Sequence, residues 1–283
     1  MPGETVEIIG LSFIFLLFIG VIIGIPLRQR YRRKLMESKG LEYYQRKYVK
    51  ENSSLYRMLP KALRLELSGY INIFLYEKEF EACGGLEEVS DQMKLLIASQ
   101  ACILMLQNKL DIFPKLQSIL VYPSAYIADG GKAIFAGSVV DAPPSVRLGE
   151  SWSRGNIVLA WDQVMRDAAS YGTGHNVTIH EFAHQIAQQD GSQDGFPFRH
   201  DPEEQREWTD ILFHEFEHLR EEVEHGQHEV IDSYGAVNKA EFFAVSTETF
   251  FCASAKMKKY HPDLYREFTE YFGSDPEKWG DVG

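Results

Sequence analysis

Cysteine is scarce in this sequence of 283 residues. Its three cysteines, Cys83, Cys102 and Cys252, are widely separated and form no CxxC pair. A disulfide framework or a cysteine-based zinc site needs paired cysteines at close spacing, so both are excluded. This pattern of cysteine use is typical of proteins in a reducing compartment.

Positive charge is also in short supply, with 29 Lys and Arg against 41 Asp and Glu and a formal net charge of -12. An acidic surface repels phosphate backbones, so we expect no nucleic-acid partner. The sequence has no internal repeat and no low-complexity stretch. Because 45% of the residues are hydrophobic and 25% are charged, the composition is that of a globular protein and excludes general disorder.

One long apolar run stands near the N-terminus, where Ile8–Leu27 contains no charged residue. As a helix with a rise of ~1.5 Å per residue, it would span the ~30 Å hydrocarbon core of a bilayer. Glu4 and Glu7 precede the run, and a basic cluster follows it: Arg28, Arg30, Arg32, Arg33 and Lys34. A signal peptide has a basic residue before its apolar run, and a buried core helix, the other alternative, usually has a polar face. By the positive-inside rule, the run predicts a single-pass transmembrane anchor in the inner membrane, with the rest of the chain facing the cytoplasm.

The remaining sequence predicts a mainly helical α+β fold. Apolar residues recur every three or four positions over 61–80 and 86–107, which predicts two helices. Short stretches rich in β-branched and aromatic residues predict the strands of a small sheet at 116–127, 132–139 and 156–161. Helical periodicity returns after the last of these stretches and continues almost to the C-terminus.

These patterns divide the chain into three predicted parts. Residues 1–34 form the membrane anchor with its basic cytoplasmic flank, and residues 35–110 form a helical lobe. Residues 111–283 form the catalytic domain, because the residues with the clearest chemistry lie there.

A metal-binding motif, HExxH, runs from His180 to His184. Two residues four apart on a helix point only ~40° apart, so both imidazoles lie on one face and can share an ion. Two imidazoles suit zinc and leave room for a third ligand and a water molecule. Glu181 reaches the rim of such a site, where it can act as a general base. We therefore predict one zinc ion and a hydrolytic site here.

A second HExxH runs from His214 to His218. The first copy lies in an almost uncharged, apolar segment, which predicts a buried helix. The second copy has Glu217 inside it and Arg220 after it, followed by further acidic residues, which predicts an amphipathic surface helix with both histidines on the solvated side. We expect the first copy to hold the zinc ion.

Several acidic residues are candidates for the third ligand. One known arrangement needs a histidine at position 190. This chain has Asp190 there, and Asp190 stays a rival candidate. Glu203 and Glu204 lie in a charged stretch that is typical of a surface. Glu241 and Glu248 lie seven residues apart on one face of an apolar helix. Burying a carboxylate costs several kcal/mol unless a cation compensates, so we expect Glu241 to bind the metal and Glu248 to orient a ligand histidine. The alternative is that both acids lie on an exposed edge.

The sequence resembles a known family at this point. HEFAHQI at 180–186, followed by DSYGAVNKAEFFAVSTETFF at 232–251, is similar to the zinc metallopeptidases related to Mlc titration factor, of the HExxH-plus-Glu (gluzincin) type. The block GESWSRG at 149–155 is also similar to that family. The resemblance covers roughly residues 60–280. The apolar N-terminal run and the second HExxH depart from the family's pattern.

The resemblance implies a zincin-like metallopeptidase domain in which His180, His184 and Glu241 bind zinc, Glu181 is the base and Tyr234 is a catalytic tyrosine. It also implies peptide or protein substrates and includes aminopeptidase activity. Because the family is associated with binding a repressor of sugar uptake, the alternative is a membrane-tethered protein that sequesters a cytoplasmic transcriptional regulator around a structural zinc ion. Glu181 favours the enzyme, since a purely structural site needs no base.

Overall fold

The computed structural model describes residue 18 and residues 24–107, 112–124, 126–128, 132–134, 155–189, 195–199, 201–227 and 230–281. The predicted anchor, Ile8–Leu27, therefore lies largely outside the described residues. Within the described part of the chain, no helix combines the length and the apolar character that crossing a bilayer requires.

The described chain is mainly helical, as predicted. Its α-helices are α2 (Tyr43–Asn52), α3 (Ser54–Met58), α4 (Lys61–Glu77), α5 (Asp91–Ala101), α7 (Trp161–Ala169), α8 (Val177–Gln189), α9 (Pro202–Glu224), α10 (Lys239–Cys252), α11 (Ser254–Tyr260) and α12 (Pro262–Phe272). Short 3-10 turns are η1 (Cys102–Met105), η2 (Ser233–Ala236) and η3 (Pro276–Asp281). The strands are β1 (Glu79–Ala82), β2 (Ser118–Tyr122), β3 (Tyr126–Ala128), β4 (Lys132–Ile134) and β5 (Asn156–Ala160).

The strands form a small three-stranded parallel sheet in the order β1-β2-β5 and a separate antiparallel pair of β3 and β4. In the parallel sheet, Phe80 pairs with Ile119, which pairs with Ile157. Parallel neighbours need long crossovers, and here α5 lies between β1 and β2 in the sequence. The sheet therefore joins strands from both sides of residue 110, and the three-part division of the chain stays a prediction.

Two sequence predictions need correction at the strands, and a third is tested only in part. The helix predicted over 61–80 ends at Glu77, and β1 follows it, because a strand of four residues is too short to interrupt a helical pattern visibly. The single strand predicted over 116–127 is two strands in different sheets, with Pro123 between them. Of the stretch predicted at 132–139, only β4 lies within the described residues.

The helix predicted over 86–107 is confirmed with narrower limits. It begins after Ser90, whose side chain accepts a hydrogen bond from the Met93 amide, and it ends in the 3-10 turn η1. Gly84 and Gly85 have φ values of +61° and +87°, a left-handed conformation that favours glycine, so they form the turn before this helix.

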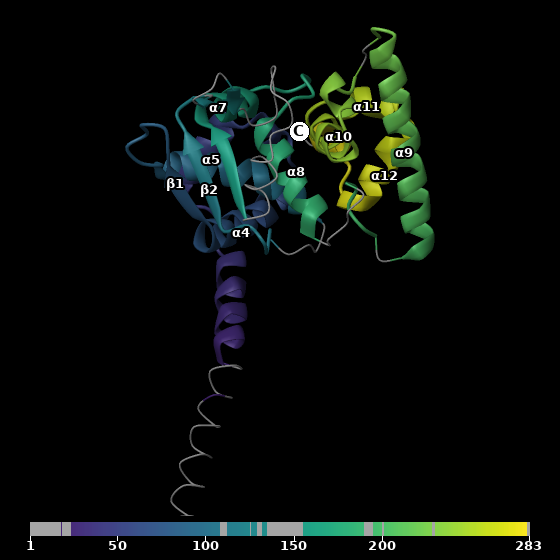
Figure 1. Cartoon of the computed structure of the whole chain (residues 1–283). Coiled ribbons are helices and arrows are strands. Elements are labelled where there is room, and N and C mark those ends of the chain that lie inside the picture. Colours follow the sequence, from purple (N-terminus) through teal and green to yellow (C-terminus); the bar gives the residue numbers. More distant parts are fainter. Residues whose placement is uncertain are drawn as a thin grey trace, which may run out of the picture.

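An N-terminal helix over residues 24–37 leaves the body of the protein beside α4 (Figure 1). Arg33 donates two hydrogen bonds to the Glu77 carboxylate, at 2.5 and 2.8 Å. A Cβ at Gly69 would lie 2.6 Å from the Glu37 carbonyl oxygen, so only glycine allows this close approach. The end of the N-terminal helix is therefore fixed against α4.

Helix α8 lies at the centre of the molecule, between the parallel sheet on one side and α10 on the other (Figure 1). Phe182 on α8 packs against Phe74 and Phe113, with ring centroids 5.6 and 4.7 Å apart, and all three side chains are buried. On α10, Phe243 packs against Trp208 of α9 and Phe268 of α12. These aromatic contacts fix the positions of α8 and α10, the helices that carry the predicted metal ligands.

We predict that Phe182→Ala destabilises the protein. Residues two apart on a helix point ~200° apart, so Phe182 faces away from His180 and His184, and its removal leaves a cavity in the core. The free energy of unfolding, measured by urea denaturation, should fall by about 3–5 kcal/mol. Phe213→Ala is the matched control, because Phe213 is 46% exposed, and it should cost less than about 1 kcal/mol. Equal losses in the two variants would contradict this account of the core.

Candidate metal centre

Helix α8 presents His180, Glu181 and His184 in a buried position, with 2%, 4% and 1% of their surfaces exposed. Polar side chains hold the first turn of this helix. The Asn176 side-chain oxygen accepts a hydrogen bond from the Ile179 amide at 3.1 Å, and the Asp167 carboxylate accepts one from the Val177 amide at 3.0 Å. The rest of the helix is packed on most sides, as the apolar sequence around the first HExxH predicted.

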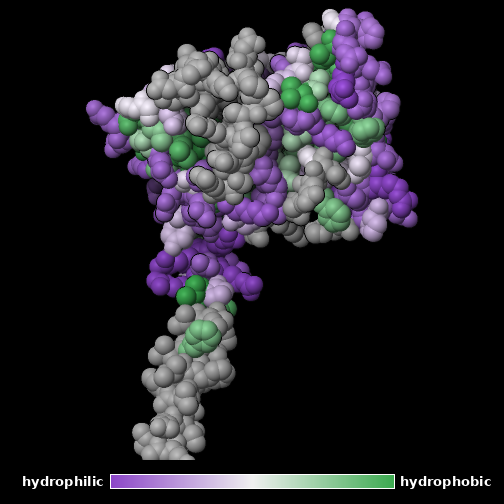
Figure 2. All heavy atoms as spheres, in the orientation of Figure 1, coloured by the Kyte–Doolittle hydropathy of each residue, from purple (hydrophilic) through white to green (hydrophobic). Residues whose placement is uncertain are grey.

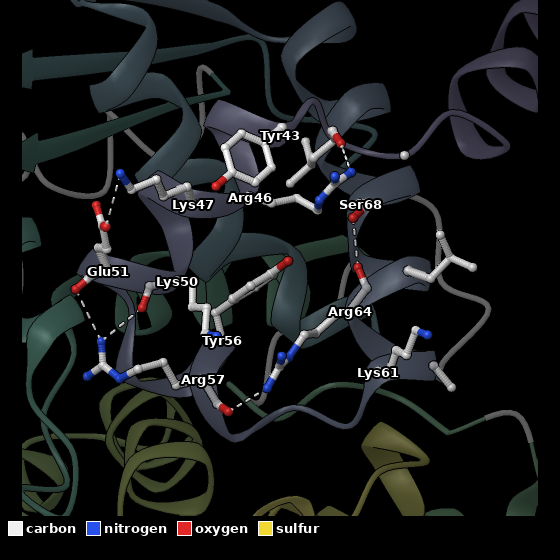
Figure 3. Close-up of a pocket in the computed structure, with 14 residues that line it drawn as sticks. Tyr43, Arg46, Lys47, Lys50, Glu51, Tyr56, Arg57, Lys61, Arg64 and Ser68 are labelled. Carbon is white, nitrogen blue, oxygen red and sulfur yellow. Dashed lines mark hydrogen bonds and ion pairs between the residues drawn. The ribbon is translucent and has the colours of Figure 1, made fainter.

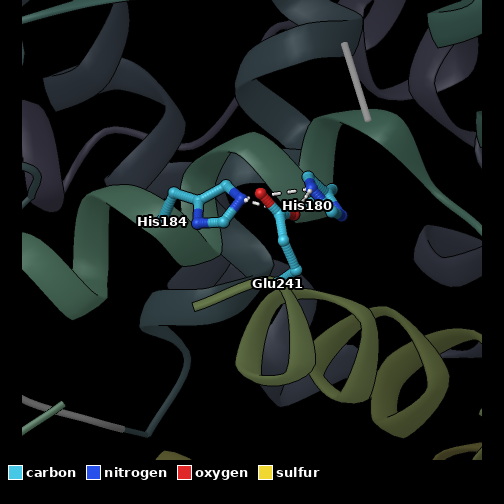
Figure 4. Close-up of side chains that lie close together, drawn as sticks. All are labelled: His180, His184 and Glu241. Atoms are coloured by element: carbon cyan, nitrogen blue, oxygen red, sulfur yellow. Dashed lines mark hydrogen bonds and ion pairs between the residues drawn. The ribbon is translucent and has the colours of Figure 1, made fainter. Parts of the chain in front are cut away.

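Helix α10 brings Glu241 to the two histidines (Figure 4). Its carboxylate oxygen lies 3.1 Å from His180 Nε2 and 3.2 Å from His184 Nε2. The two Nε2 atoms lie 3.1 Å from each other. Asn238 caps the start of α10 by accepting the Glu241 amide hydrogen at 3.0 Å, which fixes Glu241 in the first turn. The structure thus brings together three residues from two segments of the chain that lie more than fifty positions apart.

The three atoms have the spacing that a zinc ion requires. Ligands bound tetrahedrally at ~2.0–2.1 Å lie ~3.3 Å from one another, and the three observed distances are slightly shorter. Two imidazole nitrogens and one carboxylate oxygen are a donor set that zinc favours and that leaves a fourth position open. Among the described residues, this is the one group of three or more metal-ligating side chains close enough together to hold an ion. The donor set therefore fits a metal ion.

Glu248 fixes the orientation of one histidine. It is 2% exposed, and its Oε1 accepts a hydrogen bond from His180 Nδ1 at 2.7 Å. An ionised carboxylate can only accept, so Nδ1 carries a hydrogen, and in the neutral imidazole the lone pair of Nε2 then points at the cluster. Such a contact fixes the tautomer of a metal-binding histidine. Glu241 is also buried, with 7% exposed, so the alternative of two acids on an exposed edge is wrong.

The electrostatics keep both carboxylates ionised. Burial raises the pKa of Glu241, but hydrogen bonds with His180 and His184 outweigh it and lower that pKa to about 2. Burial likewise raises the pKa of Glu248, while the charge of His180 and hydrogen bonds with His175 and His180 lower it below its usual value. The two buried carboxylates lie at the two ring nitrogens of His180, and their charges favour a cation between them, which is a protonated imidazole here and would be a metal ion at Nε2 when one is bound.

Tyr234 lies at the edge of this cluster, in the 3-10 turn η2. Its ring centroid is 6.1 Å from that of His180. Burial raises the pKa of its phenol above the usual value, and the negative charges of Glu241 and Glu181 raise it further. The phenol therefore stays protonated at neutral pH and can donate a hydrogen bond. Tyr234 thus lies close to one predicted metal ligand, and its catalytic role stays a prediction.

The second HExxH lies on α9, outside the cluster. His214 and His218 are exposed, whereas the packing face of the helix is apolar. Figure 2 shows hydrophilic side chains along most of this helix, at the right of the view. The prediction of an amphipathic surface helix is thus confirmed. Glu203 and Glu204 are exposed in its first turn, and Asp190 lies outside the described residues.

Sequence reasoning missed three residues that support the site. The first two, Asn176 and His175, contact Glu248. Its Oε2 accepts a hydrogen bond from the Asn176 amide at 2.5 Å and lies 3.0 Å from His175 Nδ1. The third, Asp167, holds the start of α8. Asn176 occupies a capping position three residues before Ile179, a signal that the sequence does contain. His175 and Asp167 give no local signal, because their partners come from distant elements.

A buried pair of histidines and a glutamate on two packed helices, with a second glutamate next to the first histidine, defines the metallopeptidase class of site. Residues 27–273 match the family described as glucose-regulated metallo-peptidase M90. The chain belongs to this family, which confirms the resemblance drawn from the motifs.

Relatives in other organisms cover most of the chain. An uncharacterized protein of Synechocystis sp. is 35% identical over 266 residues, which is 93% of this chain and 95% of the relative. Mlc titration factor A of Serratia proteamaculans is 30% identical over 66% of this chain and 71% of its own length. Mlc titration factor A of Escherichia coli O1:K1 is 30% identical over 72% of this chain and 76% of its own length.

We predict that the two HExxH copies differ in zinc binding. His180→Ala removes a buried donor from the cluster and should abolish stoichiometric zinc binding, because two remaining protein ligands hold the ion poorly. His214→Ala is the matched control, since it changes the same position of the second motif on an exposed face. Zinc content of the purified proteins, measured by atomic emission, tests this. Zinc lost from the control and kept in His180→Ala would reverse the assignment.

Proposed function

We propose that this protein is a zinc-dependent peptidase with a zincin-like catalytic domain, in which His180, His184 and Glu241 bind one zinc ion. The observation that carries the proposal is the position of Glu181, buried on α8 between the two histidines. A purely structural zinc site closes its coordination with protein ligands and has no use for a carboxylate beside it. Membership of a metallopeptidase family supports the same conclusion.

The proposed mechanism assigns a separate task to each residue. A zinc ion bound here would polarise a peptide carbonyl and lower the pKa of a water molecule. Glu181 accepts the proton of the attacking water and later donates it to the leaving amine. Tyr234, held in its protonated form, donates a hydrogen bond to the carbonyl oxygen as negative charge develops there. Glu248 keeps His180 in the tautomer whose Nε2 can bind the metal.

We predict that Glu181→Gln abolishes most activity and leaves zinc bound. Glutamine keeps the size of the side chain but cannot accept the proton, so peptide hydrolysis should fall at least about 100-fold, with zinc content unchanged. Tyr234→Phe should cause a smaller loss, because it removes one donor and leaves the base and the ligands in place. Turnover of fluorogenic peptides measures both effects. We propose an aminopeptidase, so peptides with a free N-terminus should be cleaved and peptides with an acetylated N-terminus should not.

Glu215→Gln is the matched control for this experiment. Glu215 occupies the same position of the second HExxH, where its carboxylate lies 2.7 Å from Nδ1 of the buried His261, in a contact that includes none of the predicted metal ligands. Activity of this variant should match that of the wild type. Hydrolysis by Glu181→Gln at the wild-type rate would refute the mechanism.

A second candidate function is binding of a cytoplasmic transcriptional regulator, with zinc in a structural role. It is favoured by the relatives named Mlc titration factor A, since that name denotes a protein that titrates Mlc. The variants above separate the two functions, because capture of a regulator should survive Glu181→Gln, whereas hydrolysis should not. If the wild-type protein binds the regulator but hydrolyses no peptide, this second function is favoured.

We also propose that Ile8–Leu27 anchors the chain in the inner membrane, with the body in the cytoplasm. The uncharged length of this run and the basic residues that follow it support the proposal. We predict that the full chain stays in membranes washed with alkaline carbonate and that a chain beginning at Lys34 is released. Release of the full chain by carbonate, or digestion of its body by protease added outside intact cells, would contradict the anchor.

A further inference from the structure

A groove of about 1320 Å³ opens on the helical lobe, between α2, α3 and the first half of α4 (Figure 3). None of the side chains that line it belongs to the metal centre or to the HExxH on α9. One end of the groove is formed by Gly40 and Leu41, which directly follow the segment that packs along α4. The groove is therefore a separate feature of the molecule that the proposed peptidase reaction does not use.

Cations dominate its lining, although the whole chain has a net charge of -12. Six basic side chains line it: Arg46, Lys47, Lys50, Arg57, Lys61 and Arg64. Glu51 is the one acidic residue among the lining, and it pairs only loosely with Lys47, at 3.9 Å. Charges of one sign gathered in a concave site repel one another and attract an anion, so this concentration favours an anionic ligand.

The arginines are held in place without being neutralised. Arg57 Nη1 donates to the carbonyls of Lys50 and Glu51, at 3.2 Å each, and Arg64 Nη2 donates to the Arg57 carbonyl at 2.7 Å. Arg46 donates to the Leu41 carbonyl. Across the described residues, none of these three guanidinium groups forms an ion pair with a carboxylate. Because an arginine has five N–H donors, each keeps donors for a ligand.

Two further donors lack partners at the floor of the groove. Tyr56 is 97% buried, being 3% exposed, and its hydroxyl has no hydrogen-bond partner within the described chain. In Figure 3 this hydroxyl points between the guanidinium groups of Arg46 and Arg64. Arg64 Nε is buried and also without a partner, while its guanidinium carbon lies 5.5 Å from the centroid of the Tyr56 ring. Unlike Arg64 Nε, the Tyr56 hydroxyl is open to the groove, so a ligand oxygen can accept its hydrogen bond.

The rim of the groove is apolar as well as cationic. Tyr43 is 74% exposed and Leu65 is 66% exposed, and both belong to the lining. Exposed side chains of this kind, next to charged groups, contact the organic part of a ligand more readily than they contact a bare ion.

We propose that this groove binds a phosphate monoester with an apolar organic part. The phosphate lies at the floor against Arg46, Tyr56 and Arg64, and the organic part lies against Tyr43 and Leu65. A phosphate monoester matches the site better than a carboxylate, because it carries nearly two negative charges and three acceptor oxygens for the converging donors. The same chemistry occurs in soluble phosphate esters and in the headgroup of phosphatidic acid.

Isothermal titration calorimetry of the full chain in a nonionic detergent and a phosphate-free buffer tests the proposal. The probes are phenyl phosphate, as a soluble monoester, and dihexanoyl phosphatidic acid, as a lipid monoester. Benzyl alcohol is the neutral control. Tyr56→Phe keeps the buried ring and removes only the hydroxyl, and it should weaken binding about tenfold or more, as should Arg64→Gln.

Matched controls separate the groove from general surface charge. Tyr44→Phe changes an exposed tyrosine of α2 that does not line the groove, and Arg206→Gln removes an exposed cation of α9. Both should bind the probes as the wild type does. Circular dichroism and the unfolding midpoint establish that each variant folds, and Glu181→Gln should bind normally because the site is independent of the metal centre.

Each outcome decides the proposal. Binding of both probes, weakened by Tyr56→Phe, supports recognition of the phosphate monoester itself. Binding of phenyl phosphate alone identifies soluble esters as the source, and binding of dihexanoyl phosphatidic acid alone identifies the lipid. The proposal is overturned if neither probe binds, if benzyl alcohol binds equally well, or if folded Tyr56→Phe binds as tightly as the wild type.

Discussion

The arrangement of the site depends on the buried contact between α8 and α10, and above all on the hydrogen bond from His180 Nδ1 to Glu248 at 2.7 Å. This bond sets the tautomer of His180, and the same carboxylate accepts the amide hydrogen of Asn176 at the start of α8. Glu248 therefore joins the two helices and determines where Nε2 points. Glu241, two turns earlier on α10, is brought to the histidines by the same contact. A buried carboxylate is stable here because its oxygens have partners, and a second buried carboxylate at the other nitrogen of His180 makes a cation favourable.

The aromatic core explains how two helices hold this geometry. Phe182 fixes the back of α8 against Phe74 and Phe113, and Phe243 fixes α10 against α9 and α12. Donors on rigid helices keep distances near 3 Å, which a loop would not maintain. Tyr234 lies on a short 3-10 turn next to α10, so its position follows from the same packing. The proposed peptidase chemistry thus depends on a close-packed apolar core that holds a small polar centre in place.

Charge is distributed unevenly over the rest of the molecule. The exposed face of α9 is rich in acidic residues, whereas the groove between α2, α3 and α4 gathers six cations. The arginines of that groove are oriented by backbone carbonyls, so their charge is kept available. The whole chain has a net charge of -12, so this local excess of positive charge runs against the overall charge. It is the physical basis for the proposed anion site, which shares no residue with the metal centre.

The sequence by itself determined whatever depends on local pattern. Helical periodicity gave α4, α5 and the helices after residue 161, and the spacing of His180 and His184 placed both on one face of a helix. The contrast in flanking residues also distinguished the buried HExxH from the exposed copy at His214. Tertiary structure decided what joins distant segments: the parallel pairing of β1 with β2, the convergence of Glu241 on the histidines, and the contacts of His175 and Asp167. The same holds for the groove, whose cations come from three helices. Periodicity reports the face on which a side chain lies, but the partner of that face is chosen by the packing of the whole chain, so no local pattern could identify it.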